Sequence, residues 1–451
     1  MPPELDGLQR RLSEIVGGEQ VQAGASASGF AVDGVTPRLA VRPGSQEEVE
    51  AVVVACGAAG AVVGCRGGGT AMGVGNPPGR LDVVVCLDRL ARIVELDDAN
   101  LNVSAEAGVR LAELQAALAA RREFLPLDPP QADRVTVGGL VAANASGPSR
   151  LLYGSVRDWV LGLRVVLPSG ERIRCGGKVI KNVSGYDMNK LFIGSLGTLG
   201  IVTEATFKLL PSPATRATVV GVFPELSQAT EVVRRTLESF LLPEALDALN
   251  AEALGAVDSA LGVAGAAGYG LVAALAGSPE TVARQVRDFT RLFAEGSASA
   301  TATLQGAQAG AAWLAIRDVQ ARLRGTPAER VVVKIAVPIG RTLELLSSAE
   351  ALARRHGWRA VVSAHAGSGV VRAGYAVEGG GTESLRDGLR ALRDQAEGAE
   401  GSLVLEAAPE ALKRSLDAWG RPREGLSVMR RLKAEFDPRG LMSPGRFLGG
   451  I

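Results

Sequence analysis

Apolar and polar positions along the N-terminal half of the chain predict short strands, helices and unusually glycine-rich connections. Apolar residues recur at helical spacing over residues 5–15. Ser45 and Glu48 have the spacing of a capping box, so a second helix is expected to begin there. β-branched runs at 61–65 and 81–87 predict strands on either side of a glycine-rich loop.

The same kind of pattern continues as far as residue 212. It predicts a strand at 102–105, a helix at 110–121, a strand at 160–166, a hairpin with a return strand at 172–175, and a strand ending at 210. Pro211-Ser212-Pro213 then marks a domain boundary, because proline favours turns and ends regular structure.

Beyond residue 213, strands and helices alternate in two similar sets. The first set is strand 217–223, helix 226–241, strands 245–249 and 270–276, helix 279–294 and strand 300–304; the second is strand 330–337, helix 341–357, strands 359–364 and 370–377, helix 383–397 and strand 402–405. Each set is expected to form a β-α-β-β-α-β unit, and together they predict an antiparallel sheet with helices on one face. A last helix is predicted at 425–436, followed by an ordered tail.

The composition narrows the class of protein. Of the 451 residues, 47% are apolar and 4% aromatic, and the formal net charge is +1. These values suit two or three domains with aliphatic cores, and they exclude both disorder and general binding to nucleic acid. No run of ~18 apolar residues occurs and residues 1–20 lack a signal-peptide core, which predicts a cytoplasmic protein without a membrane span.

Few residues are suited to metal or hydrolytic chemistry. The four cysteines never occur as C-x-x-C, which indicates neither a zinc site nor an iron–sulfur cluster. His356 and His365 are the only histidines. With two histidines, neither a Ser–His–Asp triad nor a metal site with several histidine ligands is expected.

The loop at 66–78 contains five glycines in nine residues between two predicted strands. Such a loop exposes consecutive backbone N–H groups, which suits a diphosphate, although a flexible linker has the same composition. Rossmann and Walker loops require a helix that begins on the glycines. Here a strand follows Asn76-Pro77-Pro78-Gly79, so neither nicotinamide dinucleotide nor ATP binding by these routes is expected.

A second stretch, residues 136–148, consists almost only of small residues. Small side chains let a segment press against a flat ligand, or equally against another part of the backbone. Two further motifs follow, Lys181-Asn182-Val183-Ser184-Gly185-Tyr186-Asp187 and Gly194-Ser195-Leu196-Gly197-Thr198-Leu199-Gly200-Ile201.

In this order, the four motifs resemble the FAD-binding domain of the vanillyl-alcohol-oxidase or PCMH-type flavoproteins. The resemblance covers about residues 36–212, and Phe436-Asp437-Pro438 with Pro444-Gly445-Arg446 matches the end of the same family. It implies an α+β fold: a two-subdomain PCMH-type FAD-binding domain at 36–212 and an antiparallel-sheet cap with ferredoxin-like repeats at 213–420. Residues 1–35 would be an N-terminal helix and connector, and 421–451 a helix and tail that return to the FAD domain.

The resemblance also implies which residues bind the cofactor. The glycine loop would cradle the FAD pyrophosphate, the small-residue stretch would line the dinucleotide and the flavin, and Gly200-Ile201-Val202 would hold the adenine end. The full implied set is Arg66, Gly67, Gly68, Gly69, Thr70, Ala71, Met72, Gly73, Pro129, Thr136, Gly138, Gly139, Ala142, Asn144, Ser146, Gly147, Gly154, Arg157, Asp158, Lys181, Gly200, Ile201 and Val202. No histidine lies in the first loop, so the FAD is expected to be non-covalent.

One departure from the family lies in the motif that binds a divalent metal beside the substrate. Metal-dependent 2-hydroxyacid dehydrogenases of this family carry His-Ala-Gly-Asp-Gly-Asn-x-His, whereas this chain has His365-Ala366-Gly367-Ser368-Gly369-Val370-Val371-Arg372. An acidic residue and a histidine are replaced, so no metal ligand set is expected. His365, Arg372 and Lys181 are the candidate catalytic residues, although His365 and Arg372 could equally be structural.

This pattern, with Gly-Ser-Leu-Gly at 194–197, is similar to the E-type FAD subunit of glycolate oxidase. The resemblance implies oxidation of a small 2-hydroxy acid such as glycolate or lactate. It also implies partners: a second FAD subunit and an iron–sulfur subunit, through which the complex would associate with a membrane. A stand-alone FAD oxidase or dehydrogenase and a catalytically silent, FAD-retaining assembly subunit are the alternatives.

Overall fold

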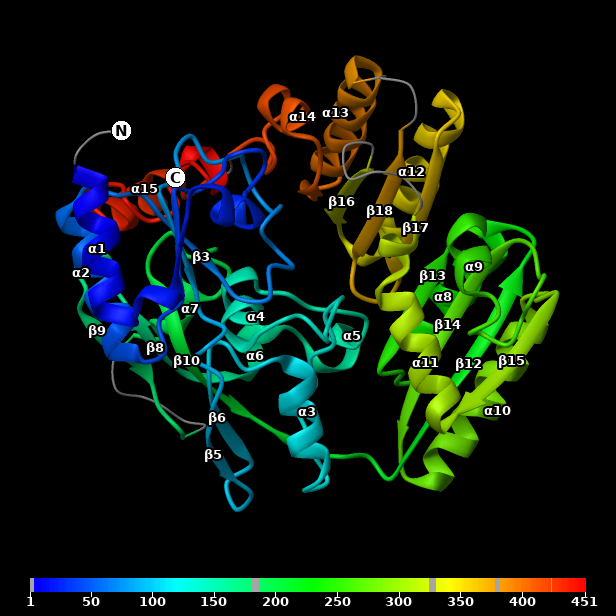
Figure 1. Ribbon diagram of the computed structural model, residues 1–451. Helices are drawn as coiled ribbons and strands as arrows, with labels where there is room; N and C mark the ends of the chain where they lie inside the picture. The colour runs from blue at the N-terminus through cyan, green and yellow to red at the C-terminus, as the bar shows by residue number, and fades with distance from the viewer. Residues whose placement is uncertain (1–3, 180–185, 324–329, 378–381, 423) are drawn as a thin grey trace. The chain divides into compact units, whose positions relative to one another are not determined.

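The computed structural model describes residues 4–179, 186–323, 330–377, 382–422 and 424–451. The chain divides into two compact units. Unit 1 comprises residues 1–146, 155–212 and 421–451, and unit 2 comprises residues 147–154 and 213–420 (Figure 1). The short segment 147–154, which lies within the FAD-domain motifs, belongs to unit 2 by its contacts.

Unit 1 begins with a small sheet of order β1-β2-β4-β3. Its strands are β1 (Val21–Ala23), β2 (Leu39–Val41), β3 (Val63–Arg66) and β4 (Val83–Cys86), and β4 pairs in parallel with both β2 and β3. Helices α1 (Glu4–Val16) and α2 (Gln46–Ala58) pack on it through a shared aliphatic core. The predicted capping box is confirmed: Ser45 Oγ accepts from the Glu48 N–H at 3.1 Å, and Glu48 Oε2 accepts from the Gly44 N–H at 2.6 Å.

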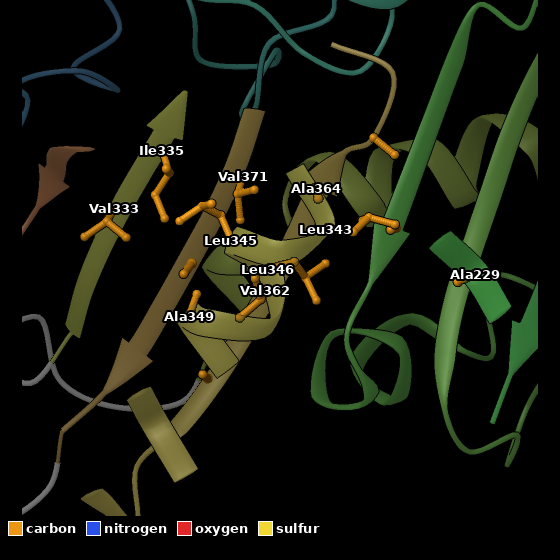
Figure 2. Packing of buried hydrophobic residues seen from close by; sticks show 14 of the residues in the cluster. Ala229, Val333, Ile335, Leu343, Leu345, Leu346, Ala349, Val362, Ala364 and Val371 are labelled. Carbon is orange, nitrogen blue, oxygen red and sulfur yellow. The ribbon is translucent and has the colours of Figure 1, made fainter. Parts of the chain in front are cut away.

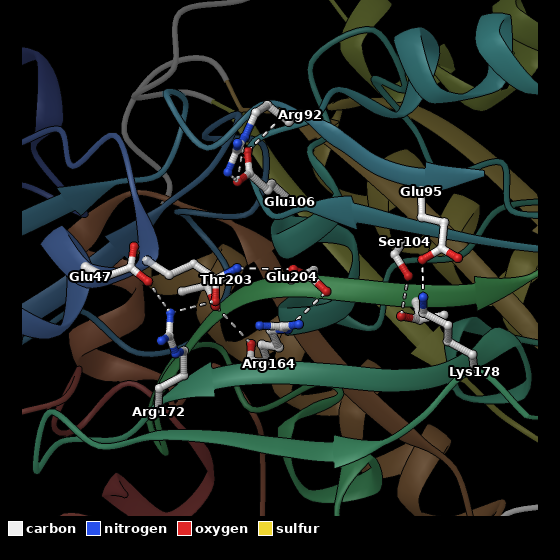
Figure 3. Close-up of polar contacts among 12 residues, drawn as sticks. Glu47, Arg92, Glu95, Ser104, Glu106, Arg164, Arg172, Lys178, Thr203 and Glu204 are labelled. Atoms are coloured by element: carbon white, nitrogen blue, oxygen red, sulfur yellow. Dashed lines mark hydrogen bonds and ion pairs between the residues drawn. The ribbon is translucent and has the colours of Figure 1, made fainter. Parts of the chain in front are cut away.

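The second sheet of unit 1 is antiparallel, with the order β5-β6-β10-β8-β9. Its strands are β5 (Ile93–Asp97), β6 (Asn102–Glu106), β8 (Val160–Val166), β9 (Arg172–Gly176) and β10 (Ile201–Lys208). Figure 3 shows the ion pairs that cross it, including Arg92 with Glu106 at 2.7 Å and Arg164 with Glu204 at 3.2 Å. Ser104 and Thr206 share a buried hydrogen bond of 2.8 Å between β6 and β10.

Short helices connect these strands. They are α3 (Leu111–Ala119), α4 (Val137–Ala143), α6 (Val156–Trp159) and α7 (Asn189–Phe192), and a two-stranded ladder joins β7 (Glu123–Phe124) to β11 (Leu210–Pro211). Helix α4 lies on β10 and β6. It begins at Thr136, whose Oγ1 accepts from the Gly139 N–H at 3.3 Å, and it ends at Asn144 in the left-handed conformation. The small-residue stretch is therefore a capped helix packed on a sheet.

The C-terminal segment returns to the first sheet of unit 1. After α15 (Leu426–Phe436), the tail lies along β3, where the Val63 N–H donates to Leu441 O at 2.8 Å and the Ser443 N–H donates to Val63 O at 2.9 Å. The buried Asp437 carboxylate accepts from the Lys433 ammonium at 2.7 Å and from the Met442 N–H at 2.8 Å. These contacts make the tail an ordered extension, as predicted.

Unit 2 is built on one antiparallel sheet of order β15-β12-β14-β13-β17-β18-β16-β19. Its first half contains β12 (Thr215–Phe223), β13 (Ala245–Leu249), β14 (Tyr269–Gly277) and β15 (Ala300–Gln305); its second half contains β16 (Arg330–Ala336), β17 (Arg359–His365), β18 (Val370–Ala376) and β19 (Ser402–Ala407). Within each half the strands follow the spatial order 4-1-3-2 of a ferredoxin-like repeat. The two predicted repeats are thus present, and the pairing of β13 with β17 joins them.

One face of this sheet is covered by the four long helices α8 (Leu226–Leu237), α10 (Pro279–Glu295), α12 (Thr342–His356) and α13 (Thr382–Gly398). Figure 2 shows the packing at α12, where Leu345 and Leu346 meet Val333, Val362 and Val371 of the strands. Because neighbouring side chains of a strand point to opposite faces, the residues between these positions point away from α12.

The prediction that helices cover only one face is wrong for the first repeat. Helices α9 (Ala251–Val257) and α11 (Gly306–Arg317) form a second core on the opposite face, with Val220, Val222 and Val272. Both helices are rich in alanine and glycine, so their apolar periodicity is weak and the residue pattern did not distinguish them from loops.

Candidate functional site

Unit 1 contains a cavity with about 950 Å³ of space between atoms, part of which is open to solvent. Its wall combines the glycine loop, helix α4, the segment 196–202 and the C-terminal tail. The lining residues are Val32, Gly64, Cys65, Arg66, Gly67, Gly68, Gly69, Thr70, Ala71, Met72, Pro78, Arg80, Leu81, Leu87, Thr136, Gly138, Gly139, Ala142, Ala143, Leu196, Gly197, Gly200, Ile201, Val202, Ser443 and Arg446.

The glycines of the loop are required by its packing against the start of α4. A Cβ atom at Gly68 would lie 1.6 Å from Arg134 O, and one at Gly67 would lie 2.1 Å from Thr136 Oγ1. Gly138 in turn leaves no room for a Cβ, which would come within 2.7 Å of the Ala107 side chain. Two stretches far apart in the sequence thus touch through backbone and form one wall.

The same loop presents unused hydrogen-bond donors. Within the described residues, the backbone N–H groups of residues 67–71 donate to no acceptor, and all five residues line the cavity. Backbone N–H groups almost always find a partner, and consecutive ones form a concave anion site. The loop therefore fits the pyrophosphate of a dinucleotide.

Arg446 of the tail holds the carbonyl side of this loop. Its guanidinium donates to Met72 O at 2.6 Å, Val74 O at 2.7 Å and Asn76 O at 2.9 Å, and pairs with Asp33 at 3.1 Å. Burial lowers the pKa of Arg446 from its ordinary value, while Asp33 opposes this change. Arg446, which stands near the C-terminus, therefore ties three carbonyl groups of the loop together.

The structure brings many of the predicted cofactor residues together in this cavity. Those that line it are Arg66, Gly67, Gly68, Gly69, Thr70, Ala71, Met72, Thr136, Gly138, Gly139, Ala142, Gly200, Ile201 and Val202. Those outside the lining set are Gly73, Pro129, Asn144, Ser146, Gly147, Gly154, Arg157 and Asp158. Lys181 lies outside the described residues, so its two predicted roles stay predictions.

Two of the residues outside the lining have identifiable surroundings. Asp158 accepts from the Ser155 N–H at 2.8 Å and from Ser155 Oγ at 3.0 Å, which caps α6. The Asn144 Oδ1 atom is buried and has no hydrogen-bond partner among the described residues. Asp158 therefore serves at least as a helix cap, and the predicted cofactor roles of Asp158 and Asn144 both stay predictions.

Several lining residues were missed by the sequence reasoning. Ser443 and Arg446 belong to the tail motif, but no pattern in the sequence indicates that the tail reaches the glycine loop. Leu196 and Gly197 belong to the motif at 194–201, in which only Gly200 and Ile201 are predicted to bind the cofactor. Burial raises the pKa of the Cys65 thiol to about 12, so this lining residue is a poor nucleophile.

Unit 2 contains a second polar arrangement, which we call the charged row: Asp247, His365, Arg372, Lys334 and Glu406. These residues stand on the adjacent strands β13, β17, β18, β16 and β19. All five alternate with residues packed on the helices, so they lie on the face away from α12 and α13. A set of charged side chains across five strands is unusual on a sheet whose neighbouring positions are apolar.

Contacts within the charged row define the state of the histidine. His365 Nδ1 lies 2.9 Å and 3.0 Å from the two carboxylate oxygens of Asp247, and Arg372 Nη1 lies 2.9 Å from His365 Nε2. Arginine can only donate, so the assigned tautomer is a neutral imidazole that donates from Nδ1 and accepts at Nε2. Arg372 Nε also donates to Glu406 at 3.3 Å. The structure therefore joins two predicted catalytic residues, His365 and Arg372, in one network.

A metal site is not indicated in unit 2. Among the described residues, no three His, Cys, Asp or Glu side chains are grouped as metal ligands. Ser368 stands in the turn after β17, and its buried hydroxyl has no partner among those residues. The prediction of no metal rests on the chemistry of these donors, since an arginine and a serine cannot replace anionic or imidazole ligands.

Comparison with known families agrees with this geometry. Residues 37–176 match the FAD binding domain family, and residues 212–447, more than half of the chain, match the family described as FAD linked oxidases, C-terminal domain. The chain belongs to the FAD-linked oxidases of the PCMH or vanillyl-alcohol-oxidase type. It is an FAD-dependent oxidoreductase that acts on CH–OH groups, and FAD is its cofactor.

Three relatives cover this chain to different extents. The glycolate oxidase subunit GlcD of Bacillus subtilis is 28% identical over 91% of this chain and 88% of its own length. The D-lactate dehydrogenase of Archaeoglobus fulgidus is 30% identical over 91% and 93%, respectively. The glycolate oxidase subunit GlcE of Escherichia coli is 44% identical, but over only 27% of this chain and 35% of its own.

Among solved structures, p-cresol methylhydroxylase with bound substrate is similar in fold. The TM-score is 0.77 at 17% identity, and the match covers 99% of this chain and 97% of that one. The predicted fold class is therefore confirmed. No helix in the described part of the chain is both long and apolar enough to cross a membrane.

Proposed function

We propose that this protein is the FAD-binding subunit of a glycolate-oxidase-like complex that oxidises a small 2-hydroxy acid such as glycolate or lactate. The observation that carries the proposal is the buried His365–Asp247 pair beside Arg372. This arrangement combines a proton acceptor with a cation suited to a carboxylate. The similarity to GlcD over most of both chains, and to GlcE over a shorter segment, supports the complex.

The proposal assigns the parts of the chain as follows. Residues 36–212 and the tail 421–451 hold non-covalent FAD through the backbone donors at 67–71, with residues 1–35 as the connector. Residues 213–420 supply the substrate groups. Bound FAD would supply the acceptor for the hydride that leaves the substrate carbon.

The charged row then handles the proton and the carboxylate. Oxidation of a 2-hydroxy acid to a 2-oxo acid removes a proton from the hydroxyl group, and His365 accepts it at Nε2. Asp247 keeps the proton on Nδ1 and stabilises the imidazolium that forms. Nε2 is bound by Arg372 in this structure, so the guanidinium must turn towards the incoming carboxylate before His365 can act.

This contact also favours a second candidate, an assembly subunit that binds FAD without turnover. A histidine whose lone pair stays bound to Arg372 cannot take a proton. In that case the electrons of the complex would pass only through the partner chains.

Anaerobic mixing of the FAD-loaded protein with glycolate or D-lactate tests the proposal. Loss of the oxidised flavin absorbance near 450 nm is expected, and an unchanged spectrum would support the silent subunit. Purification from the native host identifies the partners: a second FAD chain and an iron–sulfur chain are expected. Rapid turnover by the isolated chain with an artificial acceptor would instead make it a stand-alone dehydrogenase.

A further inference from the structure

Lys334 is a member of the charged row to which neither the motifs nor the proposed proton transfer gives a role. It stands on β16 directly opposite Arg372 of β18 and opposite Val404 of β19. Its strand neighbours Val333 and Ile335 are fully buried in the core under α12. Its side chain therefore points to the same face as Arg372 and His365.

The ammonium group of Lys334 lacks a counter-ion within hydrogen-bond distance. Among the described residues, no hydrogen bond or ion pair is formed by Nζ, whereas Arg372 is paired with Glu406. Burial lowers the pKa of Lys334; the charge of Glu406 acts against this change, and the charges of Arg372 and Arg150 add to it. Two cations thus lie on neighbouring strands, Arg372 buried and Lys334 partly buried, with one partly exposed carboxylate, Glu406, near both.

Such an arrangement costs stability unless an anion completes it. Charged groups removed from water are normally paired with an opposite charge. An apolar residue at position 334 would avoid this cost, because the neighbouring residues of the strand are apolar as well. Lysine is a point charge with three donors, and arginine presents a planar fork that matches a carboxylate. Together they offer complementary contacts to the two oxygens of one carboxylate.

We propose that Lys334 and Arg372 form the site that binds the carboxylate group of the substrate, so that Lys334 determines specificity for hydroxy acids over neutral alcohols. This inference rests on the proposed function, because it names the group that recognises the substrate. In a 2-hydroxy acid the hydroxyl and carboxylate sit on adjacent carbons. His365 and Arg372 stand on adjacent strands, so they can meet both groups once the guanidinium has turned away from His365 Nε2.

Calorimetric titration of the FAD-loaded protein with oxalate and with D-lactate tests the site without requiring turnover. Lys334→Met should weaken binding of either anion about ten- to a hundredfold, which is the value of one hydrogen bond to a charged group. Lys334→Arg should restore most of the affinity. Arg341→Met, at an exposed position just after the same strand, is the matched control and should bind like the wild type.

Thermal unfolding separates binding from a structural role. Because Lys334 lacks an ion pair, Lys334→Met should leave the apparent Tm unchanged or higher. Oxalate at the same concentration should raise the Tm of the wild type more than that of the variant. Equal anion affinity in Lys334→Met and the wild type would overturn the inference. Failure of the wild type to bind either anion would do the same.

Flavin reduction tests the proposed function separately from anion binding. If the wild type binds oxalate through Lys334 but its flavin is not reduced by any hydroxy acid, the carboxylate site stands and the oxidation proposal fails. If the flavin is reduced with the same KM in the wild type and in Lys334→Met, the oxidation proposal stands and the carboxylate site fails. For a substrate that is turned over, Lys334→Met should raise KM and change kcat little.

Discussion

The cavity of unit 1 and the charged row of unit 2 differ in the groups that form them. The cavity uses backbone: its donors are N–H groups of a glycine loop, and its walls are small residues packed without room for side chains. The charged row uses side chains, with one residue on each of five adjacent strands. The first suits a long, invariant cofactor, and the second can change its ligand by single substitutions.

This difference predicts how each region responds to substitution. A backbone cradle fails as a whole when one glycine gains a side chain, because the clash is with another backbone. A row of side chains on strands can change its chemistry by single substitutions, because each side chain projects from the sheet without contacting another backbone. Substitutions in the two regions should therefore give different kinds of defect.

The largest effect is expected from His365→Gln. Loss of the proton acceptor should lower the rate of flavin reduction by about 10²- to 10⁴-fold, the usual contribution of general base catalysis. FAD content should stay at the wild-type level, because His365 lies in unit 2. His356→Gln, which changes the other histidine at an exposed position of α12, is the control. Equal loss in both variants would remove His365 from the chemistry.

Gly68→Ala should produce the opposite defect, a loss of cofactor. The added Cβ would lie 1.6 Å from Arg134 O, so the loop or the start of α4 must move, at a cost of about 1–3 kcal/mol. FAD should bind about ten- to a hundredfold more weakly, measured by quenching of free flavin fluorescence. Gly79→Ala, where a Cβ meets nothing within 4 Å, should bind FAD normally. Normal FAD binding by Gly68→Ala would contradict the proposed cradle.

A smaller loss of cofactor is expected from Arg446→Lys. A lysine keeps the charge but cannot donate simultaneously to Asp33, Met72, Val74 and Asn76 as the guanidinium does. Loss of part of this network should weaken FAD binding by about 0.5–1.5 kcal/mol, the net value of an ordinary hydrogen bond. Arg430→Lys removes a single exposed hydrogen bond to Gly449 O and serves as the control. Equal affinity in the two variants would show that the tail does not hold the loop.

The smallest effect concerns pH. Carboxylate binding needs the ammonium form of Lys334. Burial lowers the pKa of Lys334, as do Arg372 of β18 and Arg150 of α5 (Arg150–Tyr153), while Glu406 of β19 raises it. Affinity for the hydroxy acid should therefore fall as pH rises through this lowered pKa, below the ordinary value of the side chain. KM should rise a few-fold in the alkaline range. In Lys334→Arg the rise should disappear, since a guanidinium stays charged; a persistent rise would assign it to another group.

Much of the fold followed from the residue pattern because its signals are local. The capping box at Ser45, the alternation in the strands of unit 2 and the long helices α10 and α12 each depend on neighbours a few residues apart. Helices α9 and α11 were missed because alanine-rich sequences carry little apolar periodicity. The second layer they form therefore appeared only in the structure.

For the site, the same distinction holds. The sequence by itself determined that a glycine-rich loop without a following helix is present, that no histidine lies in that loop, and that residues 365–372 lack the acid and second histidine of the metal motif. Only the tertiary structure decided that Arg446 holds this loop from the other end of the chain, and that Asp247, Lys334 and Glu406 join His365 and Arg372. Composition and spacing report contacts within a segment, whereas sheet order decides which distant strands place their charges side by side.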